Sequence, residues 1–309
     1  MRDREDITLR VVSGPTGVGK TALAVEYART CGAELVSADS MQVYRELNIG
    51  TAKPTAEELK GIPYHLINLL SIREKFDAGK FVALAREKLR ELAASGKPAL
   101  IVGGTGLYLR ALTEGLHEVP AAPDLRKRLE DEGAAHGWES LHRRLAQCDP
   151  ASAEKIHPND SVRIVRALEV FEATGKRLSE LKQEWNASER HRNLRLVVLT
   201  CGREELRERI AQRTAEMLRA GWAEETRTLL AQGYSPRLHA FRSIGYSQLA
   251  GRIARGGSLD GIQDEIVRAT MQYAKRQWTW FRSMGGVRWI DISAQPSPEL
   301  PKMLANFLA

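Results

Sequence analysis

One segment restricts the fold of this chain more than any other: Gly14, Pro15, Thr16, Gly17, Val18, Gly19, Lys20 and Thr21. It matches the pattern G-x-x-x-x-G-K-[ST], a glycine-rich loop between a strand and a helix. The context agrees, because residues 7–13 are rich in β-branched side chains and residues 21–30 have a helical pattern. In such a loop the backbone N–H groups and the helix N-terminus attract phosphate oxygens. Lys20 adds a full charge, and the Thr21 hydroxyl is placed to ligate Mg²⁺. The loop therefore predicts a polyphosphate site.

The rest of the chain predicts an α/β fold with a helical insertion. Strand patterns alternate with helices such as residues 81–94, which indicates a parallel sheet covered on both faces. We expect a P-loop NTPase-like core formed by residues 1–115 and 194–309, and a helical insertion domain over residues 116–193. Further strands are predicted at residues 34–38, 99–102, 194–200 and 287–293.

Composition excludes several classes of protein. The 309 residues show no apolar run long enough for a membrane span, and the first ten lack the apolar core of a secretory signal. Three widely spaced cysteines fit a reduced, cytoplasmic protein without a disulfide or zinc framework. The net charge of +7 is concentrated between Arg203 and Arg288, where 15 Lys and Arg face 9 Asp and Glu. This excess favours a polyanionic partner.

Polar residues follow two other predicted strands. Asp39 comes directly after residues 34–38, whereas the strand at residues 99–102 ends in a glycine-rich turn rather than in an acidic residue. Asp39 is therefore a metal-site carboxylate, a turn cap or a general base beside the phosphates. Gln42 is able to pair with an adenine edge. Thr105, in the turn, offers a hydroxyl to a phosphate or a base, and Leu107 and Tyr108 are expected in the core.

Basic residues recur farther along the chain. Asp160 is a plausible N-cap for a helix that places Arg163 and Arg166 on one face. A later helix carries Arg207, Arg209 and Arg213, and arginines in this position suit a leaving phosphate. The composition of Arg242, Ser243, Ile244, Gly245, Tyr246 and Ser247 is typical of RNA contacts, and residues 273–282 interleave cations with aromatic side chains.

Seven segments, in order, resemble the tRNA dimethylallyltransferase family, also called tRNA isopentenyltransferases. They are GPTGVGKT, SADSMQVYRELNIGTAKP, GGTGLYLRAL, HPNDSVRIVRALEV, ML-AGW, RSIGY and YAKRQWTWFR, and they extend from about residue 10 to residue 282. Long eukaryotic relatives carry a C-terminal zinc finger, and this sequence shows none, which resembles the bacterial form.

The resemblance implies transfer of a dimethylallyl group from dimethylallyl diphosphate to N6 of the adenosine at tRNA position 37, next to the anticodon. Asp39 resembles the general base, and Thr105 resembles a residue that holds the reacting region. Arg213, Lys20 and a Mg²⁺ ion on Thr21 resemble the clamp on the departing diphosphate. The implied tRNA contacts, in an anticodon stem-loop bound to a monomer, are Asp39, Ser40, Met41, Gln42, Thr105, Lys127, Val162, Arg163, Ile164, Val165, Arg166, Arg242, Ser243, Ile244, Gly245, Tyr246 and Ser247. Many relatives have Gln where Val162 stands.

The residues alone leave three other readings open. A P-loop small-molecule or nucleotide kinase would use the insertion as a lid. An RNA-binding NTPase would use ATP as a switch. A prenyltransferase acting on free AMP is the third reading, although the long insertion and the basic C-terminal third favour a macromolecular acceptor.

Overall fold

The computed structural model describes residues 7–115, 122–181, 193–293 and 299–308. The chain divides into two compact units. The first combines Met1–Thr113 with His191–Ala309, and the second is Glu114–Arg190. These boundaries lie close to the predicted positions 116 and 193. Among the described helices, none has both the length and the apolar character that a membrane crossing requires.

The first unit is built on a six-stranded sheet in the order β3-β2-β4-β1-β5-β6. All neighbouring strands are parallel, so the predicted α/β fold with a parallel sheet is confirmed. Only the two-residue strand β3 was missed, because so short a segment leaves no periodic pattern in the sequence. The strands are β1 Leu9–Ser13, β2 Glu34–Ser37, β3 Tyr64–His65, β4 Ala99–Val102, β5 Leu194–Thr200 and β6 Val287–Asp291.

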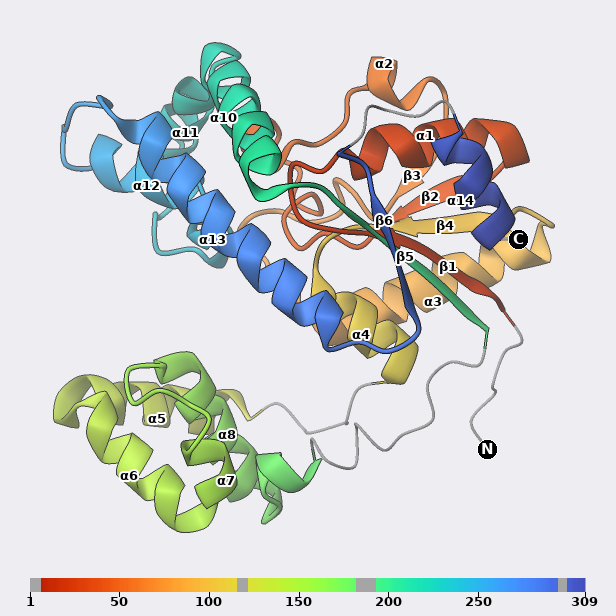
Figure 1. Cartoon of the computed structure of the whole chain (residues 1–309). Coiled ribbons are helices and arrows are strands. Elements are labelled where there is room, and N and C mark those ends of the chain that lie inside the picture. The colour runs from red at the N-terminus through yellow and green to blue at the C-terminus, as the bar shows by residue number, and fades with distance from the viewer. Residues whose placement is uncertain (1–6, 116–121, 182–192, 294–298, 309) are drawn as a thin grey trace. The chain divides into compact units, whose positions relative to one another are not determined.

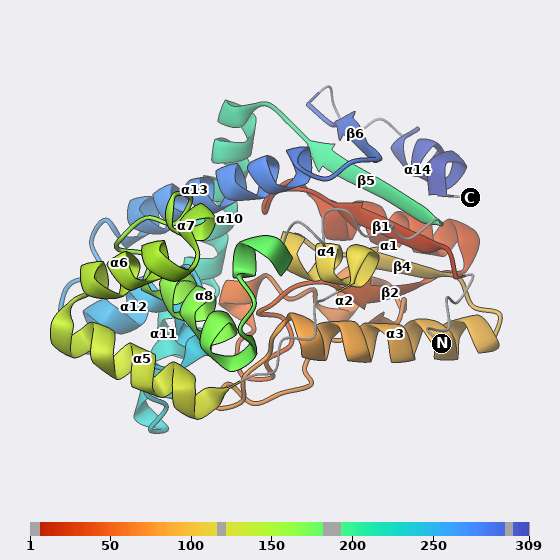
Figure 2. The ribbon, with the colours of Figure 1, turned by 90° about the horizontal axis from the view of Figure 1, so that it is seen from below.

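Helices cover both faces of this sheet. Helices α1 (Lys20–Cys31) and α14 (Leu300–Leu308) pack together on one face, and α3 (Ala78–Ala94) and α4 (Gly106–Glu114) lie on the other (Figures 1 and 2). Helix α3 begins three residues before the predicted start, because the Asp77 side chain accepts a hydrogen bond from Lys80 N at 3.0 Å and caps it. In α4, Tyr108 is buried as predicted, but Leu107 is 43% exposed, so its expected core position was wrong.

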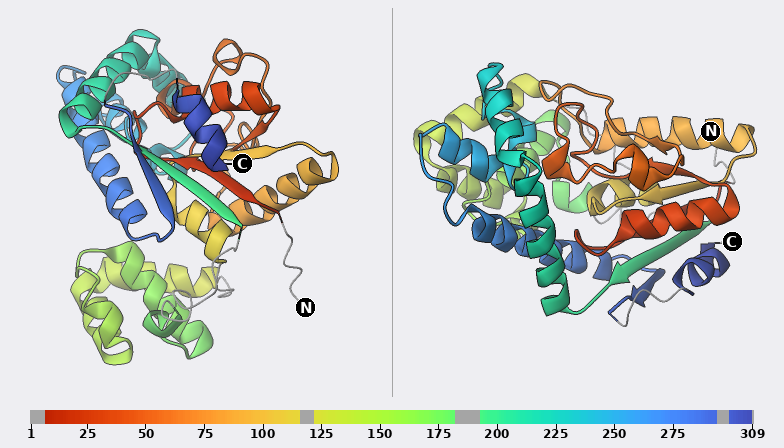
Figure 3. Two further views of the ribbon diagram at one scale, coloured as in Figure 1. Left: turned by 45° about the vertical axis from the view of Figure 1, so that its right-hand side comes forward. Right: turned by 90° about the horizontal axis from the view of Figure 1, so that it is seen from above.

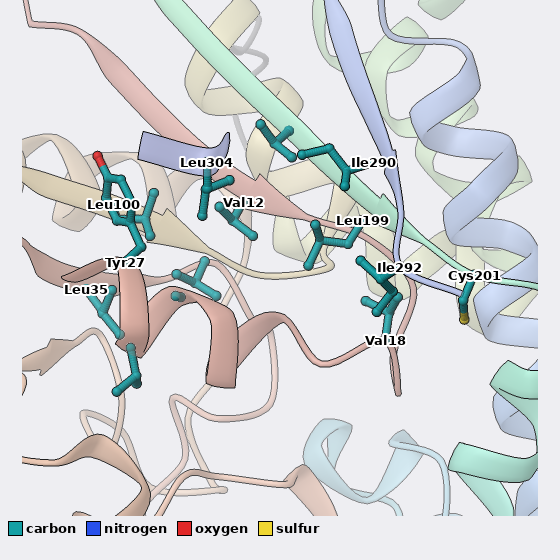
Figure 4. Packing of buried hydrophobic residues seen from close by; sticks show 14 of the residues in the cluster. Val12, Val18, Tyr27, Leu35, Leu100, Leu199, Cys201, Ile290, Ile292 and Leu304 are labelled. Atoms are coloured by element: carbon teal, nitrogen blue, oxygen red, sulfur yellow. The ribbon is translucent and has the colours of Figure 1, made fainter. Parts of the chain in front are cut away.

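A continuous apolar core holds the sheet to α1 and α14. It includes Val12 of β1, Leu100 of β4, Leu199 of β5, Ile290 of β6 and Leu304 of α14, all labelled in Figure 4. Full burial of each such side chain contributes roughly 1.5–3 kcal/mol. This packing makes the sheet a rigid platform for the loops at its edge.

A group of helices lies beyond the carboxyl ends of the strands (Figure 1 and the right-hand view of Figure 3). Helices α10 and α13 pack along each other, and α11 and α12 contact both each other and this pair. The group therefore stands opposite the loops that follow β1, β2 and β4. It comprises α10 Arg203–Arg219, α11 Trp222–Ala231, α12 Tyr246–Ile253 and α13 Ile262–Arg282, and short helical turns lie at Ile49–Thr51, Ala56–Leu59 (α2) and His239–Arg242.

The second unit is helical, as predicted, and has its own core. That core is formed by apolar side chains of its helices, among them Leu129, Leu141, Leu145, Ile164 and Val165. Ile164 and Val165 are almost completely buried in it, so the predicted contact of these two side chains with tRNA is not supported. The helices are α5 Pro123–His136, α6 Trp138–Cys148, α7 Pro150–Ala153 and α8 Ser161–Thr174.

A buried carboxylate ties α5 to α8. Glu169 is 1% exposed and accepts hydrogen bonds from Arg126 Nη2 (2.7 Å), Arg166 Nη1 (2.9 Å) and Ala122 N (3.2 Å). Burial opposes its ionisation, but these donors outweigh burial and lower the pKa of Glu169 below its usual value. Arg166 is thus engaged inside the unit, which assigns it a structural contact that the sequence did not indicate.

We expect Glu169→Ala to destabilise the second unit. Removing the buried carboxylate leaves two partly exposed arginines and one N–H without this partner, at a cost of about 2–4 kcal/mol. In the intact protein, hydrogen exchange at the α8 amides should therefore speed up by roughly 30- to 1000-fold. Glu180→Ala, which removes the exposed pair with Arg177, is the matched control and should cost at most about 1 kcal/mol. Equal exchange in both variants would contradict this role.

Candidate active site

A cavity of about 800 Å³ opens where the loops after β1, β2 and β4 meet α10 and α13. All of its lining residues belong to the first unit. Most of the predicted site residues of that unit line it, although they come from distant parts of the chain: Thr16, Gly17, Gly19, Lys20, Thr21, Asp39, Ser40, Met41, Gln42, Arg213, Arg242, Ser243 and Ile244.

The loop between β1 and α1 has the conformation that its glycines were expected to allow. Gly14 has a φ of +142°, and a Cβ there would lie 2.5 Å from the Leu199 carbonyl oxygen. At Gly17, with a φ of +87°, a Cβ would lie 2.8 Å from Ile210 Cγ1 of α10. Side chains at these positions are therefore excluded by both strain and contact. Val18 is completely buried and anchors the loop in the core, while its neighbours face the cavity.

Lys20 lies at the start of α1 with its charged end inside the loop. Its Nζ donates to the carbonyl oxygens of Pro15 (2.8 Å) and Gly14 (3.0 Å). Burial and the nearby Arg213 lower the pKa of Lys20 to about 7, although Asp39 opposes the shift. Burial therefore weakens the hold of this amine on its proton until an anion enters.

We expect diphosphate binding to take up a proton above pH 7. Below about pH 7 Lys20 already carries its charge, but above it the anion must first draw a proton onto the amine, which weakens affinity by up to about tenfold per pH unit. Calorimetry with inorganic pyrophosphate, in buffers of different ionisation enthalpy, counts the protons taken up at pH 6 and pH 8. Lys20→Arg stays charged at both pH values and should lack the additional uptake at pH 8. Identical uptake by the two proteins would contradict the depressed pKa.

The Asp39 carboxylate is held by its own turn. Its Oδ1 accepts hydrogen bonds from Met41 N (2.8 Å) and Gln42 N (3.2 Å). Within the described part of the chain, Oδ2 makes no hydrogen bond. Thr105 Oγ1 accepts from Ser40 N at 3.2 Å, so Thr105 steadies the turn beside Asp39. The carboxylate is therefore oriented by one oxygen and leaves the other for a ligand.

The Gln42 side chain is committed to the protein. It is 7% exposed, and its Nε2 donates to the carbonyl oxygens of Ala52 (3.2 Å) and Thr51 (3.3 Å). Two-point pairing of this amide with an adenine would require these bonds to break, so the geometry argues against that part of the prediction.

Arg213 is the arginine of α10 that reaches the cavity. Its Nη2 donates to Thr16 Oγ1 at 2.8 Å, which places the guanidinium against the phosphate loop. Burial lowers the pKa of Arg213, while Asp39 counteracts the shift. Arg209 instead pairs with Glu205 at 2.6 Å, and Arg207 is exposed outside the cavity.

One wall of the cavity is formed around Trp222. A Cβ on Gly50 would lie 2.1 Å from its Nε1, and one on Gly245 would lie 1.9 Å from its Cη2. Tyr246 packs edge-on against the indole, and its hydroxyl accepts from Gly50 N at 3.1 Å and donates to Glu225. Gly245 and Tyr246 are thus buried supports of the wall rather than surface contacts, whereas Ser247 is exposed.

The predicted tRNA contacts of the insertion lie in the second unit. Lys127 of α5 is exposed, as are Val162 and Arg163 near the start of α8. Asp160 accepts from Arg163 N at 3.1 Å and caps this helix as expected. Val162 is 67% exposed.

Two residues of α13, Tyr273 and Gln277, have positions at the site that the sequence pattern did not indicate. Tyr273 lines the cavity, and burial raises its pKa to about 12, with Asp39 acting in the same direction. Gln277 contacts the phosphate loop. Gln277 could have been recognised from the sequence as a polar residue on the buried stripe that includes Thr270 and Phe281. A buried amide requires hydrogen-bond partners, so its presence there predicts a polar contact.

The donor set at Thr21 fits a Mg²⁺ ion that arrives with its substrate. The Thr21 side chain lines the cavity beside Lys20. Among the described residues, no cluster of three His, Cys, Asp or Glu side chains could hold a metal alone. Mg²⁺ commonly combines one or two protein oxygens with phosphate oxygens and water, and one hydroxyl beside a phosphate loop suits that mode.

The comparisons with known proteins place the chain in a family. A family model described as IPP transferase matches residues 42–284. A tRNA dimethylallyltransferase from Syntrophobacter fumaroxidans is 46% identical over 293 residues, which cover 94% of this chain and 86% of the relative. The crystal structure of a full-length tRNA isopentenylpyrophosphate transferase from Bacillus halodurans matches with a TM-score of 0.72 and 35% identity, covering 98% of this chain and 97% of its own. A eukaryotic dimethylallyltransferase acting on tRNA matches with a TM-score of 0.81 and 26% identity, over 96% of this chain and 77% of its own. The chain belongs to the IPP transferase family.

Proposed function

We propose that this chain transfers the dimethylallyl group of dimethylallyl diphosphate to N6 of the adenosine at tRNA position 37, with Mg²⁺ as cofactor. The class of reaction, dimethylallyl transfer to tRNA, follows from its family and from relatives that bear that activity in their names. The observation that supports the detailed chemistry is the meeting of Asp39, Lys20 and Arg213 in one cavity.

These three residues serve the two ends of a substitution. The adenine amine is a weak nucleophile, while C1 of the allylic diphosphate tolerates positive charge as its C–O bond breaks. The new C1–N6 bond forms, diphosphate leaves with the C–O electron pair, and one N6 proton passes to Asp39. Asp39 thus acts as the general base.

The leaving diphosphate needs stabilisation as its charge grows. The backbone N–H groups of the phosphate loop, Lys20 and Arg213 supply it from fixed positions. Mg²⁺ on the Thr21 hydroxyl would neutralise additional charge on the diphosphate. Thr105 keeps the Asp39 turn in place through Ser40 N.

The enzyme binds the tRNA through its phosphates and reaches the target adenine by base flipping. The adenine must leave the anticodon loop stack to enter the cavity. Arg242 and Ser243 at the cavity, and the exposed Lys127, Val162 and Arg163 of the insertion, are the proposed contacts to the anticodon stem-loop. Affinity for tRNA should fall as salt rises, since counterions are released on binding.

The enzyme is proposed to act as a monomer in the cytoplasm. All three cysteines are free, which fits a reducing compartment. Light scattering of the protein alone and with tRNA would test the monomer.

A radiolabel transfer assay tests the proposal. The protein is mixed with Mg²⁺, labelled dimethylallyl diphosphate and an anticodon stem-loop with adenine at position 37, and parallel reactions contain AMP or ATP in place of the RNA. We expect label in the RNA that disappears when this adenine is replaced by guanine. Label in free AMP but not in RNA would keep the chemistry and overturn the acceptor. ATP consumption without transfer of label would indicate that the chain is a kinase or an NTPase.

A further inference from the structure

A single amide in α13 joins the two glycine-rich loops of the site. Gln277 is 5% exposed. Its Oε1 accepts a hydrogen bond from Thr16 N, in the phosphate loop, at 2.8 Å. Its Nε2 donates to the Gly104 carbonyl oxygen, in the turn after β4, also at 2.8 Å. The side chain is therefore a bridge between two segments that lie 88 residues apart in sequence.

The two partners of this bridge demand a carboxamide. Thr16 N can only donate, and the Gly104 carbonyl can only accept, so the bridging group needs one acceptor and one donor. The approach is also tight, because a Cβ on Gly104 would lie 2.3 Å from Gln277 Nε2. A carboxylate would place two acceptors face to face, and an apolar side chain would leave the buried Gly104 carbonyl and the partly buried Thr16 N–H without these partners.

Each end of the bridge continues to a group that serves the reaction. On one side, Thr16 receives the hydrogen bond from Arg213 Nη2 at 2.8 Å. On the other, Gly104 precedes Thr105, whose Oγ1 accepts from Ser40 N next to Asp39. The amide of Gln277 thus lies between the side that binds the leaving group and the side that carries the base.

We propose that Gln277 is a positioning residue that fixes the separation of the diphosphate loop from the Asp39 turn. The inference rests on the proposed function, because the two loops carry the opposite ends of that substitution. Without Gln277 the proposed catalytic side chains are all still present, but the distance between the phosphate loop and the Asp39 turn is no longer fixed. A displacement of about 1 Å between reacting groups can cost roughly 100-fold in rate.

The first test is Gln277→Met, which keeps the length of the side chain and removes both hydrogen bonds. With both substrates saturating, we expect the single-turnover rate of dimethylallyl transfer to fall by about 30- to 100-fold. The dissociation constants for inorganic pyrophosphate with Mg²⁺ and for the stem-loop should stay close to those of the wild type, since each loop retains its own ligand-binding groups. A variant that merely unfolds more easily would instead show a normal rate per folded molecule.

The second test is Gln277→Glu, which makes the defect depend on pH. An ionised glutamate accepts from Thr16 N but repels the Gly104 carbonyl, whereas a protonated one restores both bonds. Burial raises the pKa of such a carboxyl, so the change should fall within the working range. We expect the ratio of the variant rate to the wild-type rate to rise at least about tenfold between pH 8 and pH 5.5. Taking the ratio removes any dependence on pH that the two proteins share.

Gln272 provides the matched control, because it is an exposed glutamine on the same helix. Gln272→Met and Gln272→Glu should have wild-type rates and a flat ratio across pH. The inference is overturned if Gln277→Met turns over at the wild-type rate, or if Gln277→Glu shows a flat ratio. A wild-type protein that transfers no label would overturn the proposed function as well, so the two failures are distinguishable.

Discussion

Asp39→Asn is expected to lower the single-turnover rate of transfer by about 10²- to 10⁴-fold, because it removes the group that accepts the N6 proton. The asparagine Oδ1 can still accept from Met41 N and Gln42 N, so the turn keeps its shape. Binding of the stem-loop should therefore remain near that of the wild type. The measurement is a rapid-quench single turnover with labelled donor, together with a direct binding titration of the RNA.

Asp77→Asn is the control for this substitution. Asp77 also accepts a backbone hydrogen bond through Oδ1, but it caps α3 and does not line the cavity. Its variant should turn over normally. Near-normal turnover of Asp39→Asn would remove Asp39 from the role of base and leave it as a turn cap.

Arg213→Met is expected to lower the rate of the chemical step by roughly 10²- to 10³-fold, because the guanidinium faces the growing charge of the diphosphate. The methionine side chain keeps the packing that the aliphatic part of Arg213 makes within the cavity wall. The stem-loop affinity should change much less than the rate. Pre-steady-state transfer and RNA binding, measured on the same preparation, separate the two effects.

Arg207→Met provides the comparison, since Arg207 lies on the same helix but is exposed outside the cavity. It should leave the chemical step unchanged. If Arg213→Met weakened stem-loop binding and left the rate of the chemical step unchanged, Arg213 would bind the RNA rather than stabilise the leaving diphosphate.

The local patterns of the sequence predicted the elements that carry the phosphate site. The buried strands β1, β4 and β5 have short apolar runs followed by glycine or polar residues, and such runs leave few alternatives. The phosphate loop was recognisable because its glycines, lysine and threonine act within eight consecutive positions. Spacing within one segment, however, carries no information on which loops meet.

The long-range parts of the site could not be predicted in the same way. Arg213 meets Thr16 only through the packing of α10 on the loop, which the tight approach of Gly17 to Ile210 permits. Arg166 has the same local pattern as a surface arginine, yet a buried glutamate captures it. Whether an arginine serves a ligand or the fold depends on the partner that tertiary packing brings to it, and a linear pattern does not contain that partner.

The pairing of β1 with β5 has a consequence for folding while the protein is being synthesised. On one edge β1 pairs with β4, and on the other it pairs with β5, from Leu9 opposite Leu194 to Ser13 opposite Val198. A ribosome adds about 5–20 residues per second, so β1 waits on the order of ten seconds or more for β5 to be made. During that time the central strand has an open edge, which is a template for pairing with other chains. The helices of the insertion, with their local contacts, are made in the later part of this interval and can form before β5 appears. The newly made chain is therefore most in need of a chaperone while its phosphate loop is already present but its sheet is still half built.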